Sequence, residues 1–312
     1  MLKKTLLSKA SIAATTLLIV FGCSKAPAPT GSSAGGASAL VNKAAGKYAV
    51  SYSAAEPTSD VRQSSGEAQS DAPPVGRIVG VVKWNGPVPE PERIQVAKDA
   101  HVCAEHGAHD RLSELLIVNP SGGGVKDSIV SLFGKIENAK PLEELQHPDT
   151  LNQRACSYDP RVFVVPVGAR LTLTSEDEVG HNVRMNGAAD LNIAISKGGR
   201  ASRRMEQAGL VKIGCDIHPW MSGYIHVVKH PYYAVTDGDG QFELTDVPAG
   251  THQIRLWHEA WWTEDGSVAA PIVSTHSVTV RDGATTTATF EFSEPALTQT
   301  AGGKSAKATS KR

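Results

Sequence analysis

Gly214-Cys215-Asp216-Ile217-His218-Pro219-Trp220-Met221 places a thiol, an imidazole and a thioether within seven residues. Segments 210–214 and 224–228, on either side of this stretch, are rich in β-branched and other apolar residues and are predicted strands. Soft sulfur together with imidazole is the ligand set that selects copper, whereas a thioether is a poor ligand for zinc. The stretch therefore predicts a metal-binding loop between two strands.

One loop cannot close a trigonal metal site alone, so another imidazole has to arrive from a neighbouring strand end. His181 meets this requirement, because it follows Gly180 and the alternating stretch Arg170-Leu171-Thr172-Leu173-Thr174. We therefore add His181 to the three candidate ligands of the loop.

The pattern Cys-x-x-His-Pro-aromatic-Met-x-Gly-x-hydrophobic-x-Val, which begins at Cys215, resembles the copper loop of the cupredoxins, especially the short-loop amicyanins. The plastocyanin-like proteins also place a His-Asn pair before this loop, as His181-Asn182 does here. Tyr158-x-Pro160 and the run Val165-Pro166-Val167-Gly168 match the cupredoxin segment before the first ligand. The resemblance covers roughly residues 156–228.

This resemblance implies one type 1 copper ion with a full ligand set. His181 and His218 would be the imidazole ligands, Cys215 the thiolate and Met221 the axial thioether. Asn182 is implied to hydrogen-bond around the Cys215 sulfur and to join the two ligand loops.

Three other metal chemistries lack their sequence patterns. A c-type haem attachment needs a second cysteine directly before the histidine, and a dinuclear copper centre needs a second cysteine in the loop. Multicopper oxidase chemistry requires His-x-His pairs, which the sequence lacks. No arrangement of a general acid, base or nucleophile accompanies the site, so we do not expect an enzyme.

From residue 76 to residue 294, apolar and polar residues mostly alternate in short runs, and turn residues separate these runs. Short helices are expected only within 91–116 and 141–146. Many short strands at this spacing predict an all-β fold, with a cupredoxin Greek-key β-sandwich and a second small β-sandwich. The predicted strands are 77–84, 128–133, 162–166, 170–174, 210–214, 224–228, 241–244, 252–257, 277–280 and 286–292.

The segment after the loop has a resemblance of its own. Thr236-Asp237-Gly238-Asp239-Gly240-Gln241-Phe242 and Val247-Pro248-Ala249-Gly250 resemble a carboxypeptidase-regulatory-like, transthyretin-type β-sandwich. We expect residues 76–135 and 229–294 to form this sandwich, with the cupredoxin domain at 136–228 inserted between them. The alternative is a continuous cupredoxin at 76–228 beside a partial sandwich. Similar two-part proteins are labelled plastocyanin-like or methylamine-utilisation-like.

The N-terminal region predicts export. Three lysines precede a short apolar stretch at 11–22, which is too short to span a bilayer comfortably and is typical of a signal peptide. Val20-Phe21-Gly22-Cys23 resembles a bacterial lipobox, which implies a signal peptide at 1–22 and lipidation of Cys23. The alternative is an ordinary cleaved signal with an incidental cysteine.

Two further segments are predicted to be disordered. Residues 23–75 are rich in Ala, Ser, Gly and Pro, and residues 295–312 form a loosely basic tail. Such compositions bury too little apolar surface to offset the entropy of ordering the chain. We therefore expect a flexible linker behind the lipid anchor and a disordered C-terminal tail.

The number of cysteines and their expected roles predict a disulfide. With Cys23 lipidated and Cys215 on copper, Cys103 and Cys156 remain, in an oxidising compartment that favours a bridge. The tract from His101 to His109 could instead bind a second metal ion. Trp257-His258-Glu259 is interpreted as core packing, with a docking patch as the alternative.

These observations favour a one-electron carrier of the cell envelope, anchored by lipid at the outer membrane and facing the periplasm. Its partners would be a redox donor and a redox acceptor, and the membrane through Cys23. A net charge of −1 with only 20% charged residues leaves no footprint for nucleic acid. The alternative is a lipoprotein that binds or delivers copper without redox turnover.

Overall fold

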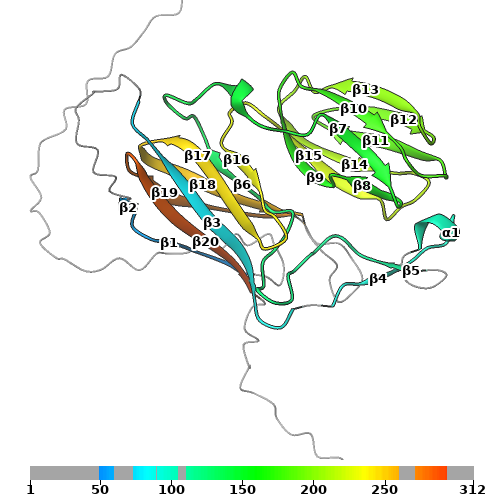
Figure 1. The fold of residues 1–312 in the computed structure, drawn as a ribbon, viewed down its shortest axis with the longest axis horizontal. Helices are drawn as coiled ribbons and strands as arrows, with labels where there is room; N and C mark the ends of the chain where they lie inside the picture. The colour runs from blue at the N-terminus through cyan, green and yellow to red at the C-terminus, as the bar shows by residue number, and fades with distance from the viewer. Residues whose placement is uncertain (1–48, 60–72, 89, 105–109, 260–270, 294–312) are drawn as a thin grey trace, which may run out of the picture. The chain divides into compact units, whose positions relative to one another are not determined.

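The computed structural model describes residues 49–59, 73–88, 90–104, 110–259 and 271–293. Most of this described chain is strand, with one α-helix, α1 (Ala100–Cys103), and one 3-10 helix, η1 (Leu142–Glu144) (Figure 1). The predicted all-β fold class is therefore confirmed. Within these ranges no helix is both long and apolar enough to cross a membrane.

Two sheets form what we call the split sandwich. In the first sheet the strand order is β1-β20-β3-β17, with β2 also paired to β20, and in the second it is β16-β6-β18-β19. The strands of the first sheet are β1 (Ala49–Ala54), β2 (Thr58–Ser59), β3 (Val75–Asn85), β17 (Gln241–Pro248) and β20 (Ala284–Ser293). Those of the second are β6 (Ile129–Phe133), β16 (Tyr233–Val235), β18 (Gly250–His258) and β19 (Ile272–Val280).

Two other sheets form what we call the inserted sandwich, over residues 150–228. One has the order β13-β10-β7-β8 and the other the order β12-β11-β14-β15-β9. The first contains β7 (Thr150–Arg154), β8 (Ser157–Asp159), β10 (Arg170–Thr174) and β13 (Arg200–Arg204). The second contains β9 (Val162–Pro166), β11 (His181–Gly187), β12 (Leu191–Ile195), β14 (Gly209–Gly214) and β15 (Ser222–Val228).

The strands of the split sandwich come from both sides of the inserted sandwich in the sequence. β3 pairs in parallel with β20, with Arg77 opposite Thr285, and antiparallel with β17. β6 pairs with β16 and β18, which both follow residue 228. Strands from both sides of residues 150–228 thus pair within the same two sheets. The transthyretin-type resemblance of this sandwich stays a prediction.

Each sandwich closes around its own apolar core. In β20, burial alternates along the strand, so Ala288, Phe290 and Phe292 are fully buried while the residues between them are less so. These side chains pack with Ile78 and Val82 of β3 in one cluster. The inserted sandwich has a separate cluster, which includes buried residues from both of its sheets. Burial of one face per sheet is what period-2 alternation predicts.

The prediction of a structureless linker over residues 23–75 is wrong where the structure describes that segment. β1 pairs with β20 over six residue pairs, from Ala49–Ser293 to Ala54–Ala288, and β2 pairs with the start of β20. Val50 and Tyr52 pack against the core of the split sandwich. Alternating apolar residues and an unpaired edge of β20 are sufficient for a strand, even in an Ala- and Ser-rich sequence.

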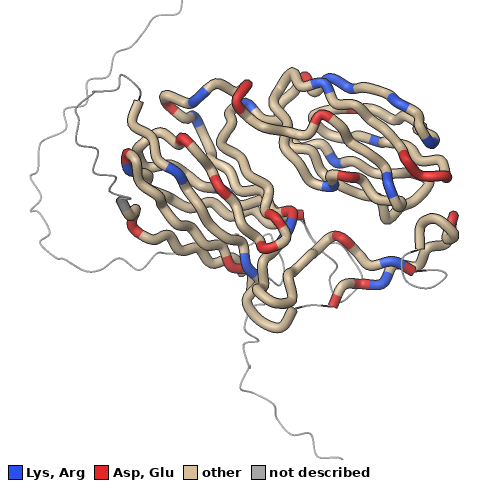
Figure 2. Tube along the Cα trace, viewed as in Figure 1, with Lys and Arg blue, Asp and Glu red and all other residues tan. Residues whose placement is uncertain are grey.

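Between β3 and β6 the chain forms a small two-stranded sheet of β4 (Arg93–Gln95) and β5 (Asp110–Leu112), with α1 between them. Both α1 and η1 fall within the two segments expected to contain short helices. Basic and acidic residues occur together in this segment and in both sandwiches (Figure 2).

His258, at the end of β18, provides a test of the split-sandwich core. Its side chain is fully buried and lies edge-on to Phe292, with ring centroids 5.6 Å apart. Burial lowers the pKa of His258 to about 4, from an ordinary value of 6.5. Between pH 6.5 and pH 4 the unfolded chain therefore binds a proton that the folded chain excludes, and stability falls as the pH falls.

We predict that, as the pH falls from 7 to 4, protonation of His258 in the unfolded chain lowers the free energy of unfolding by about 3 kcal/mol. Urea unfolding of wild type and of His258→Leu at both pH values measures this, since the variant should lose that part of the pH dependence. His101→Gln, an exposed histidine on α1, is the control and should keep the wild-type dependence. Equal pH dependence in wild type and His258→Leu would contradict the prediction.

Candidate metal centre

The loop from Cys215 to Met221 joins β14 to β15, and its own backbone closes it. Gly214 pairs with Ser222 at the base of the loop. The Cys215 amide donates to the Met221 carbonyl at 3.2 Å, and the Met221 amide donates to the His218 carbonyl at 3.0 Å. These bonds within the loop help to fix the spacing of the thiol, imidazole and thioether side chains.

Gly223, two residues after Met221, lets β15 come close to the chain before β9. A Cβ atom at this position would lie 2.2 Å from the carbonyl oxygen of Arg161, a distance that real Cβ atoms do not reach. The Tyr224 amide donates to this same carbonyl at 2.9 Å. The glycine of the loop pattern is thus required by packing of the strand that follows the loop.

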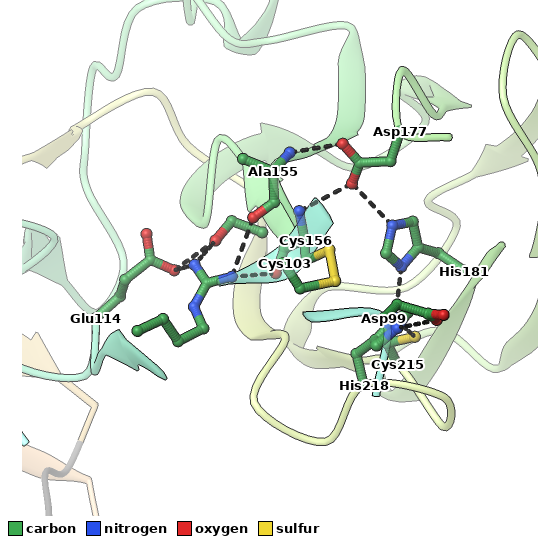
Figure 3. Close-up of a disulfide and its surroundings, with 11 residues drawn as sticks. Asp99, Cys103, Glu114, Ala155, Cys156, Asp177, His181, Cys215 and His218 are labelled. Carbon is green, nitrogen blue, oxygen red and sulfur yellow. Dashed lines mark hydrogen bonds and ion pairs between the residues drawn. A yellow bond between two sulfur atoms is a disulfide. The ribbon is translucent and has the colours of Figure 1, made fainter. Parts of the chain in front are cut away.

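Three buried side chains converge between this loop and β11. His181 is the first residue of β11, and its Nδ1 lies 2.9 Å from Nδ1 of His218. The Sγ of Cys215 lies 3.9 Å from the same His218 nitrogen. The ligand atoms of His181, Cys215 and His218 all lie within 4.8 Å of one another, and Figure 3 shows these residues together.

The outer nitrogen of each imidazole faces a carboxylate. His181 Nε2 lies 2.8 Å from Asp177 Oδ2, and His218 Nε2 lies 3.0 Å from Asp99 Oδ2. An ionised carboxylate only accepts hydrogen bonds, so it selects the tautomer that carries its proton on Nε2. Both Nδ1 atoms then turn a lone pair toward each other.

This donor set fits a single metal ion. First-row metals lie about 2.0 Å from imidazole nitrogen and about 2.3 Å from thiolate sulfur, so separations of about 3 to 4 Å between ligand atoms suit one shared ion. Two neutral imidazole lone pairs facing each other at 2.9 Å repel unless a cation or a proton lies between them. The residues therefore form a site that is complementary to a thiophilic cation.

His181 is kept in the neutral form that a metal ion requires of an imidazole ligand. Burial lowers its pKa below the ordinary value, and the hydrogen bond to Asp177 opposes this effect. A neutral imidazole at neutral pH needs no proton to leave before a metal ion binds.

Asn182 joins the two ligand segments. Its Oδ1 accepts from the Asp216 amide at 2.7 Å and lies 3.3 Å from Cys215 Sγ. Its Nδ2 donates to Asp216 Oδ2 at 3.0 Å and to Asn192 Oδ1 at 2.8 Å. The side chain therefore connects β11 with the start of the loop, beside the thiol.

Tyr158 holds the backbone of Asn182 through a hydrogen bond. Its buried hydroxyl donates to the Asn182 carbonyl at 2.7 Å. Burial raises the pKa of Tyr158 well above its ordinary value, and the nearby Cys215 adds to the shift. The hydroxyl therefore stays protonated, and a donor, at neutral pH.

Asp177 ties the centre to the hairpin turn between β7 and β8. Ala155 and Cys156 have φ angles of 50° and 54°, as in a two-residue type I′ turn, although neither is glycine or asparagine. Asp177 accepts from the Ala155 amide at 2.7 Å and from the Cys156 amide at 2.8 Å (Figure 3). One carboxylate thus stabilises a left-handed turn and orients His181.

The remaining predicted residues have the following places. Met221 is buried in the core cluster that also contains Cys215, and Cys103 and Cys156 form a disulfide. Cys23 and most of the tract from His101 to His109 lie outside the described residues, while His101 is exposed. Trp257, His258 and Glu259 are all buried, as core packing requires.

Sequence reasoning missed both carboxylates of the centre. Asp177 has a local signal, because it lies four residues before His181 in an acidic run. Asp99 has none, since 119 positions separate it from His218. Only the fold could bring these two residues together.

No family model matches the chain, and no curated protein matches it. Among solved structures, a purple cupredoxin from Nitrosopumilus maritimus is 25% identical, over 26% of this chain and 100% of its own, with a TM-score of 0.24. A Cu-containing nitrite reductase from Thermus scotoductus is 25% identical over 31% of this chain, which spans 25% of that protein (TM-score 0.25). An amicyanin mutant in its Cu(I) form is 22% identical over 32% of this chain and 98% of its own (TM-score 0.25). These structural neighbours are cupredoxins.

We predict that Asp177→Asn weakens metal binding by about 10- to 100-fold. An amide offers one oxygen where the carboxylate accepts from three N–H groups, so the imidazole and the turn cannot both keep their partner. Competition between the protein and a chelator for Cu(II) or Co(II) measures the affinity. Glu176→Gln changes the neighbouring, exposed carboxylate and should leave it unchanged. An unaltered affinity in Asp177→Asn would show that Asp177 does not orient His181.

Proposed function

We propose that the chain is a type 1 copper protein that carries single electrons in the cell envelope. One observation carries the proposal: two imidazole nitrogens and one thiol converge, and carboxylates hold both rings from behind. Thiolate with two imidazoles and a weak thioether is the ligand set of blue-copper electron-transfer sites. When bound, copper would supply the exchange between Cu(I) and Cu(II).

His181, Cys215 and His218 would hold the copper ion, with Met221 as the axial ligand. The protein contributes rigidity to this site. His181 is fixed by Asp177, His218 by Asp99, and Cys215 by the closed loop and Asn182. When the ligands are held rigidly, the geometry of the site changes little between the two oxidation states of copper. This favours rapid electron transfer over reactions that make or break bonds.

Under this proposal, lipid on Cys23 anchors the chain to the envelope, at the outer membrane facing the periplasm. Its partners are then a redox protein that donates electrons and another that accepts them. We propose no enzymatic activity, because the two carboxylates described beside the site, Asp177 and Asp99, are both engaged in orienting the imidazoles. A role in copper delivery would differ in one measurable property, ready surrender of copper to a weak chelator.

The Cu(II)-loaded protein is expected to be intensely coloured, because a short Cu(II)–thiolate bond gives strong charge-transfer absorption. Cys215→Ser should abolish this band, and Cys23→Ser should retain it as the matched cysteine control. Visible absorption and paramagnetic resonance spectra measure both. Persistence of the band in Cys215→Ser would remove Cys215 from the site and the proposal with it.

Met221 tests redox function beyond copper binding, because the long axial ligand tunes the reduction potential. Cu(II) gains more than Cu(I) from an added donor, so Met221→Leu should raise the potential and Met221→Gln should lower it. We expect the two variants to differ by on the order of 100 mV, which is about 2 kcal/mol for one electron. Protein-film voltammetry provides the measurement.

Met205→Leu is the control for this series. Met205 is buried in the same cluster as Met221, but it follows β13 and lies outside the loop. Its replacement should leave the potential at the wild-type value. If both Met221 variants also keep the wild-type potential, Met221 is not the axial ligand.

A further inference from the structure

The segment between β3 and β6 contacts the inserted sandwich next to the metal centre. We call residues 93–104 and 110–112, with β4, α1 and β5, the cap. Val96 and Cys103 of the cap are buried in the core cluster of the inserted sandwich. The cap therefore packs as part of that sandwich, although it belongs in sequence to the connection between two strands of the other one.

Two attachments hold the cap to the turn between β7 and β8. The first is the disulfide between Cys103 at the end of α1 and Cys156, both of which are buried. The second is Arg111, a buried residue of β5, whose Nη1 donates to the carbonyls of Ala155 and Cys156, both at 3.0 Å. The turn is thus held by Arg111 through its carbonyls and by Asp177 through its amides.

The cap places Asp99 against His218. Asp99 has φ 54° and ψ 34°, a left-handed conformation, and its carbonyl accepts from the amides of Val102 and Cys103 at 2.9 and 3.0 Å. Its carboxylate accepts from His218 Nε2 at 3.0 Å, and His218 is fully buried. Asp99 begins the helical turn that carries Cys103, so the backbone of this turn also orients the Asp99 carboxylate.

We infer that the cap closes the His218 side of the metal centre, and that Asp99 is the positioning residue that holds the outer edge of His218. The link between this inference and a metal ion rests on the proposed function, in which His218 is a metal ligand. The disulfide is buried and works as a permanent attachment. A chelator, an anion or the surface of a partner protein reaches His218 only when the cap opens.

Access to the centre is measurable without metal. In a Cys23→Ser background the disulfide leaves Cys215 as the sole free thiol of the full chain. The rate at which dithionitrobenzoate modifies this buried thiol in the metal-free protein reports how often the centre opens. In the copper-loaded protein, the rate of metal transfer to an excess of EDTA provides a second readout.

Asp99→Gly removes the carboxylate but keeps the left-handed turn, because glycine adopts positive φ without strain. Cys103→Ala/Cys156→Ala removes the attachment. Both variants should be modified about tenfold faster than wild type, the equivalent of about 1.4 kcal/mol in the opening equilibrium. Asp99→Asn retains an oxygen that can accept from His218, so it should stay within about threefold of wild type.

Asp110→Asn is the matched control. It breaks the ion pair between Asp110 and Arg93 in the same cap, at 2.8 Å, without touching His218, and should label at the wild-type rate. A wild-type rate in Asp99→Gly would overturn the role of Asp99. If the folded Cys103→Ala/Cys156→Ala variant is modified at the wild-type rate, the cap does not control access to the centre. Both results are independent of copper, so a colourless Cu(II) protein would reject the proposed function and leave the labelling result standing.

Discussion

The carboxylate of Asp177 is the contact on which the candidate metal centre depends. It accepts from two amides of the left-handed turn at Ala155 and Cys156 and from the outer nitrogen of His181. Without it, two residues with unfavourable φ angles would lose their compensation, and His181 could turn its lone pair away from His218. The same turn carries the disulfide, so a single acidic side chain links the β7–β8 hairpin, the cap and the first ligand. Because the group is buried, these hydrogen bonds are stronger than they would be in water.

Local patterns are sufficient to predict much of this protein. The candidate ligand loop lies between β14 and β15 because a run of apolar residues stands on each side of it, and the loop itself contains Pro219, which has no amide N–H to pair in a sheet. His181 could be placed because strand ends meet at sheet edges, where the ligand loop also lies. The alternation in 286–292 predicts the central strand of the split sandwich, since Ala288, Phe290 and Phe292 all face one core.

Other features have no local signal. β7 and β13 were not predicted, because β7 buries only Leu151 and Gln153, and β13, which pairs with β10, buries none of its residues fully and contains three arginines. β1 was taken for linker because its alanine and serine residues hide the alternation of Val50 and Tyr52. Asp99 could not be found at all, because its partner His218 is 119 positions away in the sequence and no local pattern marks it. Such residues become visible only when tertiary packing is known, since long-range contacts override local preference.

The parallel pairing of β3 with β20 has a consequence for folding during synthesis. β3 leaves the ribosome early, with Ile78, Val82 and Trp84 ready for burial, yet its partners lie at residues 241–248 and 284–293. All strands of the inserted sandwich are available once residue 228 has been added. Domains generally fold as units when their own segments are complete, and pairings over long sequence separations form late. The inserted sandwich, with its candidate metal centre, can therefore fold before the partners of β3, the earliest long strand of the chain, have been synthesised.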